Sequence, residues 1–192
     1  MPYSSMFHPV HQCDDGIFNA ASKKKISLDE PTPDMIDIKD IAAGLSKICR
    51  FGGQLKDDLF YTVAQHSVLV AAMVPDHLKK EALLHDAAEA YIHYIIKPWK
   101  NKLKAIYEPV EMAFDEAISA HFNIDLAGTR HLIKPYDRKA LELEDLALRK
   151  DNMGPLMLEL EKHNLLLPDQ WVWDHKISRK LFTVAYTGYF NL

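Results

Sequence analysis

The stretch from residue 61 to residue 100 constrains the fold most, because it sets ionisable side chains within apolar, helix-forming sequence. His66 stands among apolar neighbours, and the apolar run 82–84 leads directly into His85 and Asp86. In a protein core an unpaired imidazole or carboxylate is costly unless its pKa changes. A divalent metal ion would satisfy all three side chains at once.

Two further carboxylates complete the candidate centre. Asp137 is the fourth candidate ligand, although an acid near a helix N-terminus is also favoured by the helix dipole alone. Glu89 follows His85 by four residues, so in a continuous helix it lies one turn above His85 on the same face. That is the place of a general acid or base beside a metal rather than of a ligand. By itself a His-Asp pair is weak support for a metal, since most such pairs are solvated or ion-paired.

In this order His66, His85-Asp86 and Asp137 form the pattern H…HD…D, and the chain resembles the HD-domain metal-dependent phosphohydrolases. The likeness covers roughly residues 20–150. Within the superfamily the chain is similar to the YfbR-like 5′-deoxynucleotidases and the phage dATP triphosphohydrolases of DatZ type. The segments that carry the likeness are Asp40–Ser46, Cys49–Gly53, Tyr61–Val70 and His85–Tyr91.

The resemblance implies an all-α fold, an HD-domain helical bundle of six or seven helices with the metal site in its core. Residues 1–192 would form a single domain, with an N-terminal arm at 1–36 that could hold a short hairpin and a C-terminal helical extension at 155–192. It also implies one divalent ion, with Glu89 as the catalytic group. Two histidines and two carboxylates suit Mn²⁺, Co²⁺, Mg²⁺, Fe²⁺ or Zn²⁺, and the implied ligands are His66, His85, Asp86 and Asp137.

The same resemblance suggests five substrate-binding residues, each with an ordinary structural alternative. Arg50 would contact phosphate or lie at a helix end, and Phe51 would face the nucleoside or fill the core. Tyr94 would pack against a base or the core, and Lys97 and Lys100 would hold phosphates or form a solvated basic patch.

The chain departs from the resembled enzymes just before these lysines. His93 and Tyr94 stand where the relatives commonly have Gly and Asp. The preferred reaction is hydrolysis of a deoxynucleoside triphosphate, of dATP type, to deoxynucleoside and triphosphate. One alternative is a 5′-deoxynucleotidase that releases phosphate from monophosphates. The other is a non-catalytic nucleotide-sensing module, for which the lost Gly-Asp would be the sign.

The composition of the chain limits the class of protein to which it can belong and the partners it can have. The chain has 192 residues, 48% of them hydrophobic and 26% charged, as expected for one globular domain. Its net charge of −4 gives no general attraction to nucleic acid or anionic membranes. Cys13 and Cys49 have no metal or redox spacing, and residues 1–10 show no secretory signal. A cytoplasmic protein is therefore expected, with a nucleotide as its partner and without membrane or nucleic acid.

Periodicity and capping residues predict the main helices. Asp34 or Asp37 would cap the first helix, which would end near residues 51–53. The apolar stretches 165–167 and 181–190 predict a closing helix or a subunit contact, and hence a homo-oligomer. The other expected helices are Thr62–Val74, Asp76 to about Ile92, Tyr107–Phe122 and Pro135–Arg149, with a loop at Asn123–Gly128.

Overall fold

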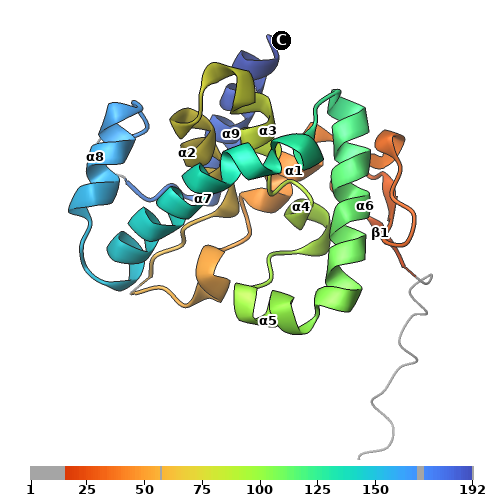
Figure 1. The fold of residues 1–192 in the computed structure, drawn as a ribbon, viewed down its shortest axis with the longest axis horizontal. Helices are drawn as coiled ribbons and strands as arrows, with labels where there is room; N and C mark the ends of the chain where they lie inside the picture. The colour runs from red at the N-terminus through yellow and green to blue at the C-terminus, as the bar shows by residue number, and fades with distance from the viewer. Residues whose placement is uncertain (1–15, 57, 168–170, 192) are drawn as a thin grey trace, which may run out of the picture.

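The computed structural model describes residues 16–56, 58–167 and 171–191. Cys13 and the segment 1–10, for which no secretory signal is expected, lie outside the described residues. Over the described residues the chain is mostly helical, as the sequence predicts (Figure 1). None of the described helices is both long enough and apolar enough to cross a membrane.

Within the described residues the elements are two short strands, three 3₁₀ turns and the α-helices. In chain order they are β1 (Ile17–Asn19), β2 (Lys25–Ser27), η1 (Pro33–Met35), α1 (Ile38–Leu45), η2 (Arg50–Gly53), α2 (Val63–Met73), η3 (Asp76–Leu78), α3 (Lys79–Leu84), α4 (Glu89–Ile92), α5 (Lys97–Lys102), α6 (Lys104–Phe122), α7 (Leu126–Arg149), α8 (Gly154–Lys162) and α9 (His175–Phe190).

The hairpin expected in the N-terminal arm is confirmed. β1 and β2 pair antiparallel, with Phe18 opposite Ile26, and Ile26 is buried. Asp40 of α1 accepts hydrogen bonds from the backbone N–H of Ser22 at 2.7 Å and from its hydroxyl at 2.6 Å. These bonds attach the tip of the hairpin to α1.

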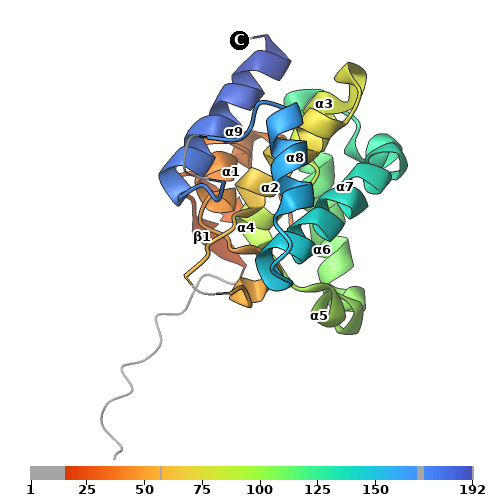
Figure 2. The same ribbon diagram turned by 90° about the vertical axis from the view of Figure 1, so that its left-hand side faces the viewer.

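Helix α2 is the centre of the fold. Its residues from Val63 to Ala71 are all buried, and apart from residues 65–67 they are apolar, as expected for a helix in the core. Thr62 caps it by accepting a hydrogen bond from the backbone N–H of Gln65 at 3.0 Å, and the predicted helix Thr62–Val74 is confirmed. Helix α9 packs on one side of α2 and α7 on the other (Figure 2). His66 therefore lies in the middle of the molecule.

Helix α1 is capped by Asp37, one of the two predicted candidates, but the prediction that it continues to residues 51–53 is wrong. It ends at Leu45, and the chain then extends so that Cys49 forms an antiparallel bridge with Thr62. Gly44, near its end, lies so close to α4 that an added Cβ would be 2.9 Å from that of Ala90. This approach fixes α4, and the segment before it, against α1.

The prediction of one helix from Asp76 to Ile92 is also wrong, because the chain forms η3, α3 and α4 in turn. Between α3 and α4 the backbone makes i→i+3 hydrogen bonds, from Ala87 N–H to the Leu84 carbonyl at 3.0 Å and from Glu89 N–H to the Asp86 carbonyl at 3.0 Å. These tighter turns rotate His85 and Asp86 relative to a continuous α-helix.

Helix α7 begins nine residues before the predicted start at Pro135 (126 against 135). Asp125 caps it by accepting a hydrogen bond from the backbone N–H of Gly128 at 2.8 Å, so much of the expected loop is helical. Pro135 lies inside the helix, which continues past the missing N–H to Arg149. The predicted helix Tyr107–Phe122 is confirmed within α6. Of the two apolar stretches that predicted a closing helix or a subunit contact, 181–190 lies within α9, whereas 165–167 is not helical.

Candidate metal centre

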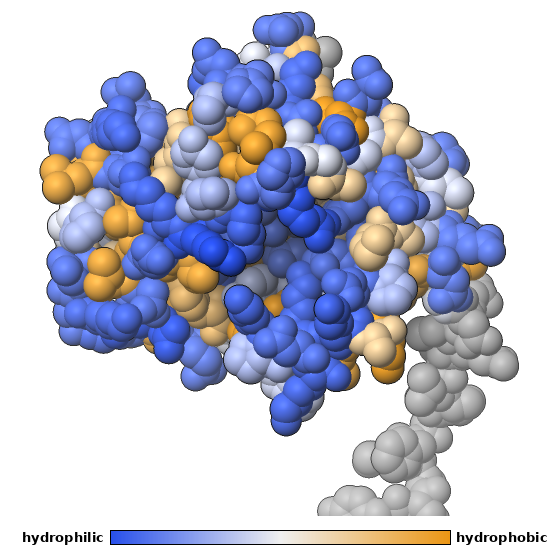
Figure 3. All heavy atoms as spheres, viewed as in Figure 1, coloured by the Kyte–Doolittle hydropathy of each residue, from blue (hydrophilic) through white to orange (hydrophobic). Residues whose placement is uncertain are grey.

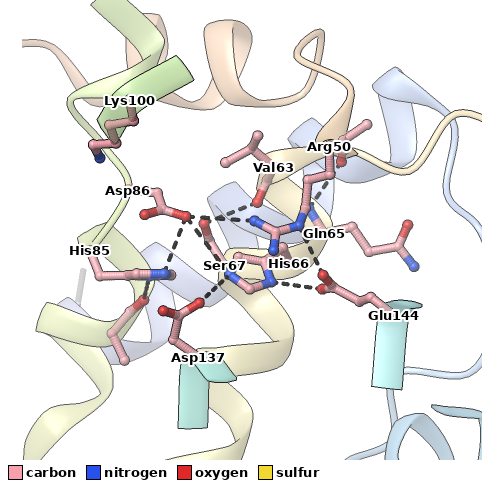
Figure 4. A network of polar contacts seen from close by, with 12 residues as sticks. Arg50, Val63, Gln65, His66, Ser67, His85, Asp86, Lys100, Asp137 and Glu144 are labelled. Atoms are coloured by element: carbon pink, nitrogen blue, oxygen red, sulfur yellow. Dashed lines mark hydrogen bonds and ion pairs between the residues drawn. The ribbon is translucent and has the colours of Figure 1, made fainter. Parts of the chain in front are cut away.

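The four predicted metal ligands come from three parts of the chain and point toward one another (Figure 4). His66 projects from the buried helix α2, and the turn after α3 supplies His85 and Asp86. Ligand atoms of these three residues all lie within 4.8 Å of one another, which is close enough to hold one metal ion. From α7, Asp137 brings its Oδ1 to 3.4 Å from His66 Nε2.

The two histidine rings are arranged as metal ligands usually are. His66 Nδ1 lies 2.7 Å from Glu144 Oε1, and His85 Nδ1 lies 2.8 Å from the carbonyl oxygen of Ala82. Both partners only accept hydrogen bonds, so each Nδ1 carries a proton and each Nε2 is the atom available to a metal ion. Metal-binding histidines almost always donate the other ring N–H in this way.

Both Nε2 atoms are buried and, among the described residues, have no hydrogen-bond partner. Asp86 Oδ2 lies 3.2 Å from His85 Nε2 and 3.7 Å from His66 Nε2, but without the alignment of a hydrogen bond. Two unsatisfied nitrogens facing two carboxylates are costly in a protein interior. A cation between them would remove that cost, so the side chains present fit a metal ion.

The charges at the centre favour a cation. Burial opposes charge on His85, yet Asp86 beside it raises the pKa of the imidazole to about 9. Burial also opposes charge on Asp86 and Asp137, and the two histidines nevertheless hold the pKa of both carboxyl groups below the usual range. Both carboxylates are therefore ionised at neutral pH, and a divalent ion would displace the proton from His85.

Glu89 is the first residue of α4 and lies near enough to Asp86 for that charge to act on it, but it is not part of the ligand cluster. The sequence predicted that Glu89 lies one turn above His85 in a continuous helix. The break after α3 makes that prediction wrong. Its side chain is buried, and Oε2 has no hydrogen-bond partner among the described residues. Burial, and then the charge of Asp86, raise the pKa of Glu89 well above its usual range.

A cavity of about 280 Å³ adjoins the ligands where α5, α6 and α7 meet. Figure 3 shows the corresponding hollow, bordered by hydrophilic side chains. Three cations line it, and each pairs with a carboxylate: Lys100 with Glu111, Arg130 with Asp115, and Lys134 with Asp137. The complete lining is His85, Asp86, Lys100, Glu111, Asp115, Leu126, Arg130, Ile133, Lys134 and Asp137.

Two bacterial proteins share much of this sequence. The chain is 43% identical to the uncharacterized protein YfdR of Escherichia coli over 137 residues, which are 71% of this chain and 75% of that protein. The chain belongs to the YfdR family. It is also 32% identical to the uncharacterized protein RCAP_rcc00048 of Rhodobacter capsulatus over 133 residues, 64% of this chain and 68% of that protein. No family model matches the chain.

In this YfdR-family chain the predicted substrate-binding residues are dispersed. Arg50 is only 4% exposed and lies among carboxylates, with its Nε 2.9 Å from Glu144 Oε2. Phe51 and Tyr94 flank its guanidinium, with ring centroids 5.7 Å and 6.0 Å from Cζ. Lys100 lines the cavity, whereas Lys97 is exposed on the first turn of α5 and is not part of the lining.

Sequence reasoning missed several residues of this candidate site. Arg130 and Lys134 of α7 and Glu111 and Asp115 of α6 line the cavity, yet no motif marks them. Glu144 contacts the centre from a fully buried position. One signal could have indicated it, because Glu144 follows Asp137 by seven residues and so lies on the same face of α7.

Proposed function

We propose that this YfdR-family chain is an HD-type, metal-dependent phosphohydrolase that acts on deoxynucleotides. The observation that carries the proposal is the pair of buried Nε2 atoms of His66 and His85, which face Asp86 and Asp137 and have no hydrogen-bond partner in the part of the chain that the structure describes. These four residues would hold one divalent ion, of the kinds that accept both imidazole and carboxylate. When bound, the ion would polarise the phosphoryl group and lower the pKa of a water molecule.

Glu89 would transfer the proton. A carboxyl group whose pKa is raised by burial holds its proton to higher pH than an exposed one and can donate it to a leaving oxygen. Its Oε2 has no hydrogen-bond partner among the described residues, so this atom is free to hold or release the proton. The leaving oxygen would be the 5′-oxygen of a nucleotide, which otherwise departs as a costly alkoxide.

The cavity favours a monophosphate over a triphosphate. Its volume of about 280 Å³ lies at the lower limit of ordinary ligand pockets, about 300–1,000 Å³. Of the three cations expected to hold a triphosphate chain, only Lys100 lines it, because Arg50 is buried among carboxylates and Lys97 is exposed on α5. We therefore favour a 5′-deoxynucleotidase, with Lys100, Arg130 and Lys134 as the charges nearest the phosphate.

A deoxynucleoside triphosphohydrolase of dATP type is the second candidate. Lys100, Arg130 and Lys134 together give the cavity three cations, which could accept more than one phosphate if their carboxylate partners move. A non-catalytic nucleotide sensor is the third candidate, and it rests on Tyr94 standing where an aspartate is usual in the resembled enzymes.

Product analysis distinguishes the three. The protein would be incubated with deoxynucleoside mono- and triphosphates in Mn²⁺ or Co²⁺, with a His85→Ala and Asp86→Ala double variant as the inactive control. Orthophosphate from monophosphates supports the favoured reaction, and intact triphosphate beside free nucleoside supports the second. Metal-dependent nucleotide binding without any product would refute an enzyme and leave the sensor.

A further inference from the structure

Glu144 is a buried carboxylate for which the reaction proposed above has no use. Its side chain is fully buried on α7, where an uncompensated charge would be strongly destabilising. Its two oxygens have separate partners, with Oε1 2.7 Å from His66 Nδ1 and Oε2 2.9 Å from Arg50 Nε. Figure 4 shows Glu144 on the side of the His66 ring opposite Asp137.

Helix α7 therefore contacts both nitrogens of one imidazole. Asp137 approaches Nε2 at 3.4 Å, and Glu144 accepts the hydrogen bond of Nδ1–H. Because two contacts on opposite sides of a ring fix its rotation, His66 Nε2 is directed at the point where the other ligands converge. The bond to Glu144 also selects the tautomer that leaves Nε2 unprotonated.

Arg50 completes this arrangement from η2. Its Nε donates a hydrogen bond to Glu144, and its Nη1 lies 3.9 Å from Asp86 Oδ2. One guanidinium therefore lies next to both Glu144 and the candidate metal ligand Asp86. A planar guanidinium with several N–H groups is suited to such a bridge. Its charge compensates Glu144, and its burial leaves it little access to a bound phosphate.

We propose that Glu144 and Arg50 are a positioning pair for the metal centre, which sets the tautomer and the direction of His66 and anchors Asp86. This inference rests on the metal site of the proposed function, and it assigns Arg50 to the support of the ligands rather than to phosphate binding. The pair acts through His66 and Asp86, and neither member is a metal ligand or a catalytic residue.

The test measures Mn²⁺ affinity and the tautomer of His66. In Glu144→Gln one carboxylate oxygen becomes an amide, so His66 and Arg50 can no longer each have an acceptor. The exposed Glu142→Gln on the same helix is the matched control. Should Glu144→Gln fail to fold, the double variant Arg50→Met with Glu144→Leu replaces both buried charges by apolar groups of similar size, a change that proteins often tolerate.

We expect Mn²⁺ affinity to fall about 10- to 100-fold in the Glu144 variants and to stay at the wild-type level in Glu142→Gln. Histidine ¹H–¹⁵N spectra of the metal-free protein should show the proton of His66 leaving Nδ1 in part of the molecules. Affinity within about twofold of wild type in a folded Glu144 variant, or failure of both variants to fold, would overturn the positioning role.

Arg50→Lys separates the two roles of the arginine. A positioning role lowers Mn²⁺ affinity and leaves the substrate KM unchanged at saturating Mn²⁺, whereas a phosphate contact raises KM and leaves Mn²⁺ affinity unchanged. Wild-type protein that binds Mn²⁺ but hydrolyses no nucleotide would refute only the proposed function. Wild-type protein that binds no Mn²⁺ would refute this inference as well.

Discussion

Removal of metal should make the stability of the protein depend on pH through His85. In the metal-free protein Asp86 raises the pKa of the buried His85 imidazole from 6.5 to about 9, against the opposing effect of burial. A pKa that is higher in the folded state stabilises the protein below the unfolded pKa, and the stabilisation is lost as pH rises through the folded pKa. The stability of metal-free protein should therefore fall between about pH 6.5 and about pH 9.

The magnitude follows from the two pKa values. Their difference of about 2.5, at about 1.36 kcal/mol for each pH unit, corresponds to about 3 kcal/mol. His85 is 13% exposed, so solvent screening reduces this little. Because the carboxyl group of Asp86 is ionised in both the folded and unfolded states above about pH 6, it adds no slope of its own in this range.

The assay is urea unfolding in EDTA at several values between about pH 6 and about pH 9.5, followed by circular dichroism. His85→Gln is the control, since it keeps a polar side chain but cannot titrate. Wild-type stability should fall more steeply with pH than that of the variant, in which buried carboxyl groups with raised pKa values, such as Glu89 and Asp115, still titrate. Saturating Mn²⁺ should remove the part of the fall that depends on His85, because the metal displaces the same proton. Equal slopes for wild type and His85→Gln would refute the reasoning.

Three other predictions concern single side chains near the site. Glu89→Gln should keep Mn²⁺ stoichiometry and lose about 10²–10⁴-fold in turnover, and full activity would make Glu89 structural. Lys100→Ala, which removes a cation from the cavity, should raise the nucleotide KM about tenfold, well above the effect of Lys97→Ala; equal effects would contradict the assignment of the cavity. His93→Gly should raise the free energy of unfolding by about 1 kcal/mol, because His93 has φ 65° and ψ 155°, a region that suits only glycine. A variant no more stable than His93→Ala would contradict that strain.

Much of the fold could be predicted because its signals are local. Thr62 before an apolar run marks α2, and Asp37 marks α1, since a capping side chain bonds to backbone only two or three residues away. The break after α3 has no such signal, because Ala87 and Ala88 are good helix formers. The predicted start of α7 at Pro135 is too late, because a proline often begins a helix. Asp125, ten residues earlier, is the residue that caps it.

The residues of the candidate site likewise include some that the sequence reveals and some that it does not. His66, His85 and Asp86 stand out because polar residues in apolar helical sequence need a partner. The seven-residue spacing from Asp137 places Glu144 on the right face of α7, but its partners His66 and Arg50 cannot be read from the sequence, because they lie 78 and 94 residues away. The reverse holds for Lys97, which fits a basic sequence pattern but is exposed outside the cavity, so pattern alone cannot tell a binding lysine from a solvated one.

The contact of α7 with both nitrogens of His66 has a consequence for how the sequence can vary. Asp137 and Glu144 are seven residues apart, close to two full turns. An insertion or deletion of one residue between them would rotate one carboxylate by about 100° relative to the other and remove it from the ring. Substitutions on the outer face of this segment would leave the spacing intact. The number of residues between Asp137 and Glu144 is therefore constrained by their shared contact with His66, whereas the identity of those residues is not.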